Sequence, residues 1–337
     1  MFKRRTLFVL GAGASAEVDL PLGTALAERI RKKMDIRFEI GNRPIGTGDM
    51  NLFAQVTEQL RHQVEEYQDA AWLIRDGLAF AQSIDDFLDL HRTNEHLNLY
   101  GKAAIVKSVL EAEQGSRLYF NELQSTIFDP ASMVDTWLVK FMYMLGRGVP
   151  KENVREIFDN VSFIVFNYDR CVEFFLRNAL RLLYRISDGE AQEIVDDLSI
   201  IHPYGVVGRA SFGATNANCL QLAAGIKTYT EQAAAAESVA QIQTEMQRAE
   251  CIVFLGFAYH SQNMTILQPA EPMKYKPIYG TAFKMSDADV EVVSNRLGNF
   301  FASEPNRSQR LRLFRLENKL MSADLFDYYA RSLSGGD

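Results

Sequence analysis

The stretch from Thr6 to Ser15 constrains the fold of this chain more than any other. A short apolar run, Leu7–Leu10, passes directly into Gly11 and Gly13, with small residues between and after them. Such a turn lets the backbone approach a phosphate group, and the N-terminus of a following helix favours its negative charge. The stretch therefore predicts a buried strand over 6–10 at the start of a parallel α/β sheet, followed by a helix over 23–33.

The same stretch also has features of a secretory signal. Residues 3–5 are basic, and Ala14-Ser15-Ala16 could be a cleavage site. The apolar run between them is too short for a good signal core. The chain has an odd number of widely spaced cysteines, with no disulfide-like framework, at Cys171, Cys219 and Cys251. The strand interpretation is therefore preferred, and we expect a soluble cytoplasmic protein.

The bulk composition is that of an ordinary globular protein. The chain has 337 residues, of which 47% are hydrophobic and 23% charged, so it can bury a substantial core. It holds no apolar stretch of the ~20 residues that a membrane span requires. Its net charge of −7 gives no overall basic surface for nucleic acid. We expect neither direct nucleic-acid binding nor a membrane span.

A long helical block follows the first strand and helix. From about 50 to 148, apolar residues recur at helical spacing. Ser83 and Asp86 form the sequence pattern of a capping box that opens a helix. Asp85 and Asp86 could be a carboxylate pair or a metal site, but adjacent residues of a helix point in different directions. We therefore interpret them as charges at a helix start.

Strands and helices alternate in the rest of the chain. We expect strands over 162–166, 198–201, 251–255 and 277–279, and helices over 171–184, 231–248, from Asp287 onward, and over 320–333. This alternation predicts a Rossmann-like, doubly wound, mostly parallel sheet with an inserted helical subdomain. The predicted division is a discontinuous sheet domain (1–48 and 155–315), a helical insertion (49–154) and a C-terminal helical tail (316–337).

Each expected strand ends in polar or glycine residues. The sets are Gly11/Gly13/Ser15, Asn167/Asp169, His202/Gly205, Gly256/Ser261/Asn263 and Gly280/Thr281. Ligands of open parallel sheets bind beyond the carboxyl ends of the strands. Five such strand ends in one chain indicate a single binding site.

The motifs at these ends are Gly-Ala-Gly-Ala-Ser, Asn-Tyr-Asp, His-Pro-Tyr-Gly, Gly-Phe-Ala-Tyr-His-Ser-Gln-Asn and Gly-Thr-Ala, in that order. In this order, over about residues 5–285, they resemble the sirtuin-like NAD-binding superfamily, and more specifically its prokaryotic branch found in anti-phage defence systems. Residues 165–169 stand where sirtuins carry Gln-Asn-Ile-Asp. The run 83–88 is similar to a recurrent helix of the defence branch.

The chain also departs from the deacylating sirtuins. Their zinc module has four cysteines in paired C-x-x-C spacing, which the three scattered cysteines here cannot supply. Residues 18–23 lack the aromatic side chain that shields the reactive intermediate in that family. Both differences disfavour acyl-lysine chemistry and favour hydrolysis of NAD⁺ by water, with no metal.

The resemblance implies roles for particular residues. The predicted catalytic group is His202 as base, Asn167 to position water or ribose, and Asp169 to hold the nicotinamide carboxamide. The predicted cofactor-binding residues are Gly11, Ala12, Gly13 and Ser15 at the phosphates, Gly256, Ser261 and Asn263 at the adenosine ribose, and Thr281 near the adenine. The structural alternatives are a strand-capping histidine, an Asp169 that caps the next helix, and a glycine turn that serves only close packing.

The function implied by the resemblance is an NAD⁺ glycohydrolase that releases nicotinamide and ADP-ribose. It would act as an NAD-depleting effector in bacterial anti-phage defence, inactive until a partner or oligomer assembles it. We expect homo-oligomerisation through the helical block and a separately encoded partner, such as a HerA-type hexameric ATPase. An NAD or ADP-ribose sensor without turnover, and a sirtuin-type deacylase or ADP-ribosyltransferase, are the alternatives.

Overall fold

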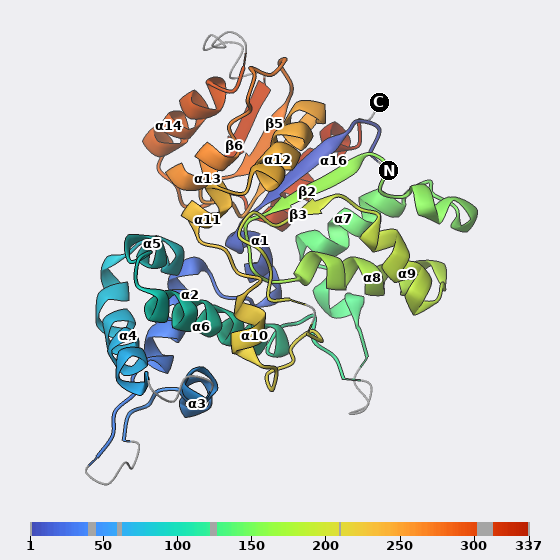
Figure 1. Ribbon diagram of the computed structural model, residues 1–337. Helices are drawn as coiled ribbons and strands as arrows, with labels where there is room; N and C mark the ends of the chain where they lie inside the picture. The colour runs from blue at the N-terminus through green and yellow to red at the C-terminus, as the bar shows by residue number, and fades with distance from the viewer. Residues whose placement is uncertain are drawn as a thin grey trace.

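The computed structural model describes residues 2–39, 45–58, 63–121, 127–208, 210–301 and 313–335. Its centre is a six-stranded sheet in the order β3-β2-β1-β4-β5-β6, in which all neighbouring strands are parallel (Figure 1). The strands are β1 (Thr6–Leu10), β2 (Val161–Val165), β3 (Ile200–Ile201), β4 (Cys251–Leu255), β5 (Ile278–Thr281) and β6 (Phe314–Glu317). This 3-2-1-4-5-6 order is that of dinucleotide-binding Rossmann folds, so the predicted fold class is confirmed.

Helices cover both faces of the sheet and form a separate group beside it. They are α1 (Ala12–Ser15), α2 (Gly23–Lys33), α3 (Met50–Glu58), α4 (Val64–Gly77), α5 (Ile84–Leu90), α6 (Glu95–Gln114), α7 (Trp137–Gly146), α8 (Cys171–Tyr184), α9 (Asp188–Asp196), α10 (Cys219–Ala223), α11 (Tyr229–Ala233), α12 (Ala236–Arg248), α13 (Ser261–Ile266), α14 (Asp287–Gly298) and α16 (Ser322–Leu333). Among the described residues, no helix is long and apolar enough to cross a membrane.

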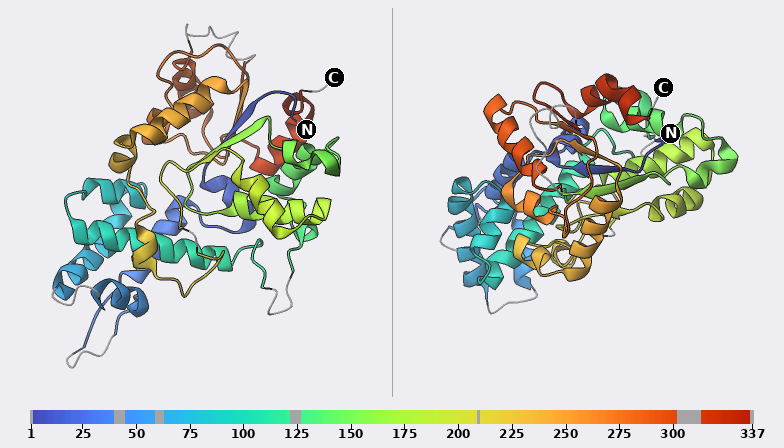
Figure 2. Two further views of the ribbon diagram at one scale, coloured as in Figure 1. Left: turned by 45° about the vertical axis from the view of Figure 1, so that its right-hand side comes forward. Right: turned by 90° about the horizontal axis from the view of Figure 1, so that it is seen from above.

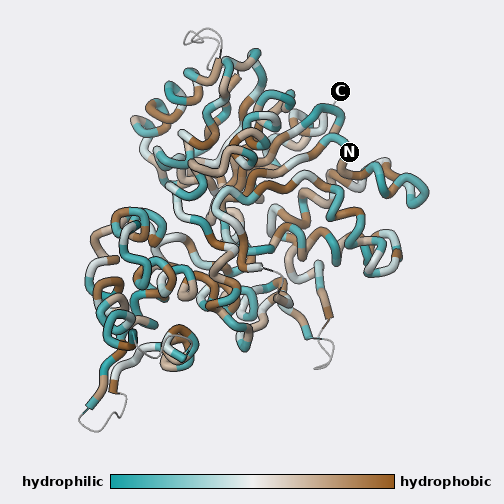
Figure 3. Tube along the Cα trace, viewed as in Figure 1, coloured by the Kyte–Doolittle hydropathy of each residue, from teal (hydrophilic) through white to brown (hydrophobic). Residues whose placement is uncertain are grey.

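Strand β1 lies between two hydrophobic cores, one on each face of the sheet. All five of its residues are buried; Leu7 and Val9 belong to one core, and Phe8 and Leu10 to the other. Side chains alternate between the two faces of a strand, so a strand covered on both faces is apolar throughout. Apolar residues accordingly run along the central strands (Figure 3). This explains why the first strand is a continuous apolar run.

One core joins helices that are far apart in the sequence. The Phe8 ring lies 5.2 Å from that of Phe141 in α7 and 6.2 Å from that of Phe326 in α16. Helix α7 therefore packs on the sheet, together with α8 and α16, although it falls inside the predicted insertion.

The remaining helices of the predicted insertion form a group with α2. Helices α2 to α6 lie together on the opposite side of the molecule from α7, α8 and α9 (Figures 1 and 2). At the other end of the chain, the predicted boundary between 315 and 316 falls inside β6. Helices α3 to α6 are thus the part of the predicted insertion that stands beside the sheet, and together with α2, which precedes the insertion, they are called the helical module below.

Several elements differ from the sequence expectation. The expected helix over 231–248 is two helices, α11 and α12, and β3 contains only two residues. Strand β6 was not expected, because its sequence Phe-Arg-Leu-Glu is short and half charged. Helix α13 was not expected either. These elements gain their stability from tertiary contacts, which local propensity does not report.

Candidate functional site

A cavity of about 880 Å³ opens at the carboxyl ends of the strands. It spans β1 and β4, the two neighbours at which the strand order reverses, which is where ligands bind in doubly wound sheets. Its lining comes from six regions: Gly11, Ala12 and Gly13 after β1; Leu22, Gly23 and Thr24 at α2; Gln82, Ser83, Asp85 and Asp86 at α5; Phe166, Asn167 and Tyr204 after β2 and β3; Gly256, Phe257, Ala258, His260, Ser261, Gln262 and Asn263 after β4; and Thr281, Ala282, Phe283, Lys284 and Met285 after β5. The sheet ends and the helical module thus form two walls of one cavity.

Most of the predicted site residues line this cavity. Those that do are Gly11, Ala12, Gly13, Asn167, Gly256, Ser261, Asn263 and Thr281. The other three, Ser15, Asp169 and His202, are not part of the lining, but they surround Asn167. Its Nδ2 donates to Ser15 Oγ over 2.9 Å, and its carbonyl oxygen lies 3.1 Å from His202 Nδ1. The structure therefore brings the predicted residues together. Of the three predicted catalytic residues, only Asn167 lines the cavity.

The glycines after β1 and β4 interlock the two loops. The N–H groups of Gly11 and Gly13 donate to Leu255 O and Gly256 O, each over 3.0 Å. Gly256 has a φ of +55°, and a Cβ there would lie 2.0 Å from the backbone nitrogen of Ala14. These glycines are therefore needed for close packing of backbone on backbone. Since the two N–H groups are already bonded, the expected phosphate cradle does not rest on them.

Residues after β4 and β5 support this arrangement. Thr281 Oγ1 accepts a hydrogen bond from Gly256 N over 2.8 Å, and Thr281 is buried. Tyr204 donates its hydroxyl to Asn263 Oδ1 over 2.6 Å. Asn263 and Ser261 lie in α13, which begins after the β4 loop. The contacts of these residues with an adenosine stay a prediction.

His202 is held in a partly buried ion pair. Its Nε2 lies 2.7 Å from Glu173 Oε1, and its Nδ1 faces Asn167 O. Burial favours the neutral imidazole, but attraction to Glu173 outweighs it, so the pKa of His202 is raised. In turn, burial opposes the charge of Glu173, but His202 holds the pKa of that carboxyl below its usual value. The sequence analysis did not identify Glu173 as the partner of His202.

Asp169 is bonded to the first residue of the helix that follows it. Its Oδ1 accepts a hydrogen bond from Cys171 N over 3.1 Å at the start of α8. Burial raises the pKa of this carboxyl, although the bonds from Cys171 and Ser15 oppose the shift. The geometry is that of the capping alternative, and Asp169 stands behind the cavity wall.

Helix α5 contributes carboxylates that were interpreted from sequence as helix-start charges only. Ser83 caps the helix as predicted, accepting from Asp86 N over 3.1 Å. Asp85 and Asp86 nevertheless both line the cavity. Both are charges of the first turn of α5, as predicted, and they also reach the cavity because α5 meets it with its N-terminal end.

Asp85 is tied to the sheet side of the site. It accepts a hydrogen bond from the hydroxyl of Tyr168, which follows β2. Burial, and after it the charge of Asp86, raises the pKa of Asp85 to about 7. A carboxyl with this pKa changes its charge near neutral pH, which is unusual for aspartate.

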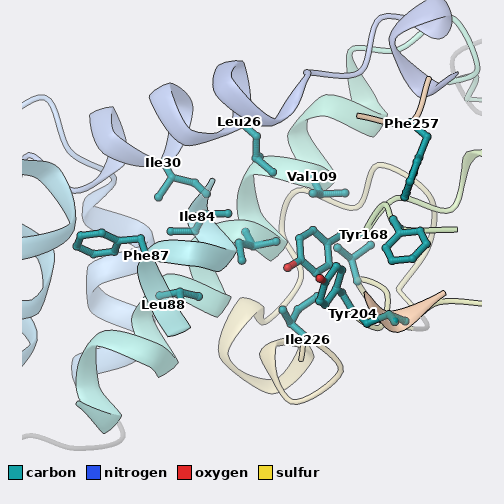
Figure 4. Close-up of a cluster of buried hydrophobic side chains, with 14 of the residues drawn as sticks. Leu26, Ile30, Ile84, Phe87, Leu88, Val109, Tyr168, Tyr204, Ile226 and Phe257 are labelled. Carbon is teal, nitrogen blue, oxygen red and sulfur yellow. The ribbon is translucent and has the colours of Figure 1, made fainter. Parts of the chain in front are cut away.

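Aromatic rings fill the region between α5 and the strand ends. Tyr168 and Tyr204 lie there next to Ile226, with Phe257 farther from α5, while Ile84 of α5 lies beside Ile30 of α2 (Figure 4). The ring centroids of Phe166 and Phe257 are 5.1 Å apart, and both residues line the cavity. Residues 18–23 supply no aromatic side chain, but loops after β2, β3 and β4 do.

No protein-family model matches this chain, and no curated protein matches it. Within the described residues, no group of three or more His, Cys, Asp and Glu side chains is placed to hold a metal ion. The character of the site therefore follows from its geometry. It is a cavity at the switch point of a Rossmann sheet, with an asparagine on the sheet wall and two carboxylates on the helical wall.

Proposed function

We propose that the cavity binds NAD⁺ and that the protein hydrolyses the bond between nicotinamide and ribose. The observation that carries this proposal is the position of Asn167. This residue lines a cavity of about 880 Å³ at the switch point of a sheet with the dinucleotide-binding strand order. The cavity offers rings for a base and polar groups for ribose hydroxyls, as dinucleotide sites do.

Asn167 is fixed in orientation. Its Nδ2 donates to Gly11 O over 3.1 Å and to Ser15 Oγ over 2.9 Å. The amide oxygen is therefore the atom that would accept a hydrogen bond from a ribose hydroxyl or from the attacking water. Holding that oxygen in place supports catalysis by positioning.

His202 contacts the backbone of Asn167 and is not itself part of the cavity lining. Since Glu173 and Asn167 O occupy both ring nitrogens, the predicted role of His202 as the base requires the ring to leave one of them. In the observed position it acts as a positioning residue for residue 167. The resemblance to the sirtuin-like superfamily supports a role for both residues in NAD⁺ cleavage.

A second function is a binding module that senses NAD⁺ or ADP-ribose without turnover. The engagement of both His202 nitrogens favours it, because that ring then has no free atom to accept a proton from water. Deacylase and ADP-ribosyltransferase activities stay predictions. The role of an NAD-depleting defence effector also stays a prediction. Homo-oligomerisation and binding of a HerA-type ATPase are predictions too, and light scattering with and without such a partner would test them.

The test is nicotinamide release from NAD⁺ by the purified full chain. We expect turnover by the wild type and its loss in Asn167→Ala. Asn160→Ala is the matched control, because Asn160 stands at the other end of β2 and donates to Phe2 O. Binding of NAD⁺ with no release of nicotinamide would identify a sensor, and absence of binding would reject both functions.

A further inference from the structure

Asp85 is a carboxyl group in the lining of the cavity. It lines the same cavity as Asn167, from the opposite wall, at the N-terminal turn of α5. The Tyr168 hydroxyl donates to Asp85 Oδ1, which fixes the carboxyl and leaves Oδ2 to act on a second partner. Asn167 and Tyr168 are consecutive, so one short loop orients the groups on both walls.

We propose that Asp85 is the general base of the reaction in this cavity. This inference rests on the proposed hydrolysis of NAD⁺. In the step, the oxygen of water forms a bond to ribose C1′, and the C1′–N bond to nicotinamide breaks. The electron pair of the broken bond goes to the ring nitrogen, so nicotinamide leaves neutral and needs no acid. The proton released by the water passes to Asp85 and then to solvent.

The chemistry of the carboxyl suits this role. A base works best when its pKa lies near the operating pH, because it is then both ionised and strong enough to take a proton. Burial and the neighbouring Asp86 raise the pKa of Asp85 to about 7. The negative charge would also stabilise the positive charge that develops on the ribose.

Other titratable groups surround α5. Their charges determine in which direction a substitution near Asp85 should move the pKa of Asp85. They are Asp86 and Asp89 on α5, Tyr168 and Tyr204 after β2 and β3, Tyr229 on α11, the Lys102–Glu231 pair of α6 and α11, and, in the cavity lining, His260 and Lys284 after β4 and β5. Asp86 disfavours the charged form of Asp85, while the Tyr168 hydroxyl favours it. Removing these two groups should therefore move the pKa of Asp85 in opposite directions.

The experiment measures kcat and KM for nicotinamide release from NAD⁺ between pH 5 and 9. Asp85→Asn is expected to lower kcat by about 10²- to 10⁴-fold, the usual contribution of a general base, with little change in KM. Asp69→Asn is the matched control, since Asp69 is an exposed residue of α4 outside the cavity lining, and it should leave both constants unchanged. Binding of NAD⁺ to the Asp85→Asn protein, followed by calorimetry, checks that the variant is folded.

The pH profile separates a base from a merely structural residue. In the wild type, kcat should rise with pH through an apparent pKa near that of Asp85. Tyr168→Phe should move this limb to higher pH, because the carboxylate loses a donor. Asp86→Asn should move it to lower pH, because a like charge is removed.

Each other outcome has a definite meaning. Unchanged kcat in Asp85→Asn, or a rise in KM alone, would overturn the inference and leave the proposed hydrolysis intact; the second result would make Asp85 a ribose ligand. A wild-type protein that binds NAD⁺ but releases no nicotinamide would overturn the proposed hydrolysis, and the inference with it.

Discussion

The two walls of the cavity are built in different ways. In the sheet wall, the backbones of Gly13 and Gly256 pack against each other and neighbouring strands set the spacing, while the loop after β5 adds the charge of Lys284. The α5 wall carries Asp85 and Asp86 and is tied to the sheet side by the bond from Tyr168. The sheet wall therefore gives the site its shape, and the α5 wall gives it most of its charge.

The largest effect should come from breaking the sheet wall. In Gly256→Ala, the new Cβ would meet Ala14 N at 2.0 Å, at a φ of +55° that alanine disfavours. We expect the free energy of unfolding to fall by at least about 4 kcal/mol, as for other severe backbone and packing conflicts. Urea unfolding followed by circular dichroism measures it.

Gly189→Ala is the control for this change. A Cβ at Gly189 in α9 has no neighbour within 4 Å, so alanine should be neutral or raise stability by up to about 1 kcal/mol. Equal midpoints for the Gly256→Ala protein and the wild type would show that the two loops are not locked as described.

The next effect concerns the ion pair behind the sheet wall. Glu173→Gln leaves His202 without its charged partner in a partly buried setting, so stability at pH 6 should fall by about 2 kcal/mol, the size of a hydrogen bond to a charged group. Glu193→Gln is the control, because its pair with Arg155 is exposed and contributes little.

The pH dependence of this pair has a definite sign. The pKa of His202 is raised above its ordinary 6.5, so its contribution is full below that pH and is lost as the pH rises through the folded pKa. The pKa of Glu173 is lowered below its ordinary 4.5, so its contribution is lost as the pH falls through the folded value. The difference between wild type and Glu173→Gln should therefore be largest at about pH 4.5–6.5 and shrink above it. A difference that grows above pH 7 would contradict this assignment.

A smaller effect should follow from removing the hydroxyl of Tyr204, which is bonded to the predicted ribose-binding residue Asn263. Tyr204→Phe removes the donor to Asn263 Oδ1 and should weaken NAD⁺ binding by about tenfold, or about 1.4 kcal/mol, the size of one hydrogen bond. Tyr184→Phe removes a hydroxyl that donates to Val149 O away from the cavity lining, so calorimetry should find its affinity unchanged. Equal affinities in the two variants would remove Asn263 from the binding site.

The smallest effect tests the α5 wall alone. Ser83→Ala removes the cap of α5 and should lower stability by about 1 kcal/mol. Ser187→Ala removes an equivalent cap from α9, with the same 3.1 Å bond, and should cost about as much. Only the first should weaken NAD⁺ binding. If both variants bound NAD⁺ equally well, the cap at Ser83 would not be needed to orient the α5 wall for NAD⁺ binding.

The sequence allows the glycine loops of the sheet wall to be predicted. For the helical wall, it predicts the start of α5 but not that Asp85 faces the cavity. A strand that ends in glycine is a local signal, so Thr6–Leu10 and the loops with Gly11 and Gly256 could be identified from short segments. The cap at Ser83 is local too. The cavity position of Asp85 depends on its contact with Tyr168, which is 83 residues away in the chain. No spacing rule contains that information.

His202 illustrates a different limit. Its place at the end of β3 could be predicted from the motif, but its surroundings could not, because Glu173 faces it from α8. A residue type indicates the chemistry that is possible. The partner decides which atoms remain available for it.

The interlocked glycines also restrict motion. Because Gly13 and Gly256 pack backbone on backbone, the two loops can shift only as one rigid unit. Widening or narrowing of the cavity then comes from the rest of its lining: α5, with α11 packed against it, the start of α2 and the loop after β5. Occupancy of the cavity should be visible as slower amide hydrogen exchange in 84–90 and 229–233, with little change at the strand ends. A molecule bound to the helical module could sense the state of the cavity without touching its contents.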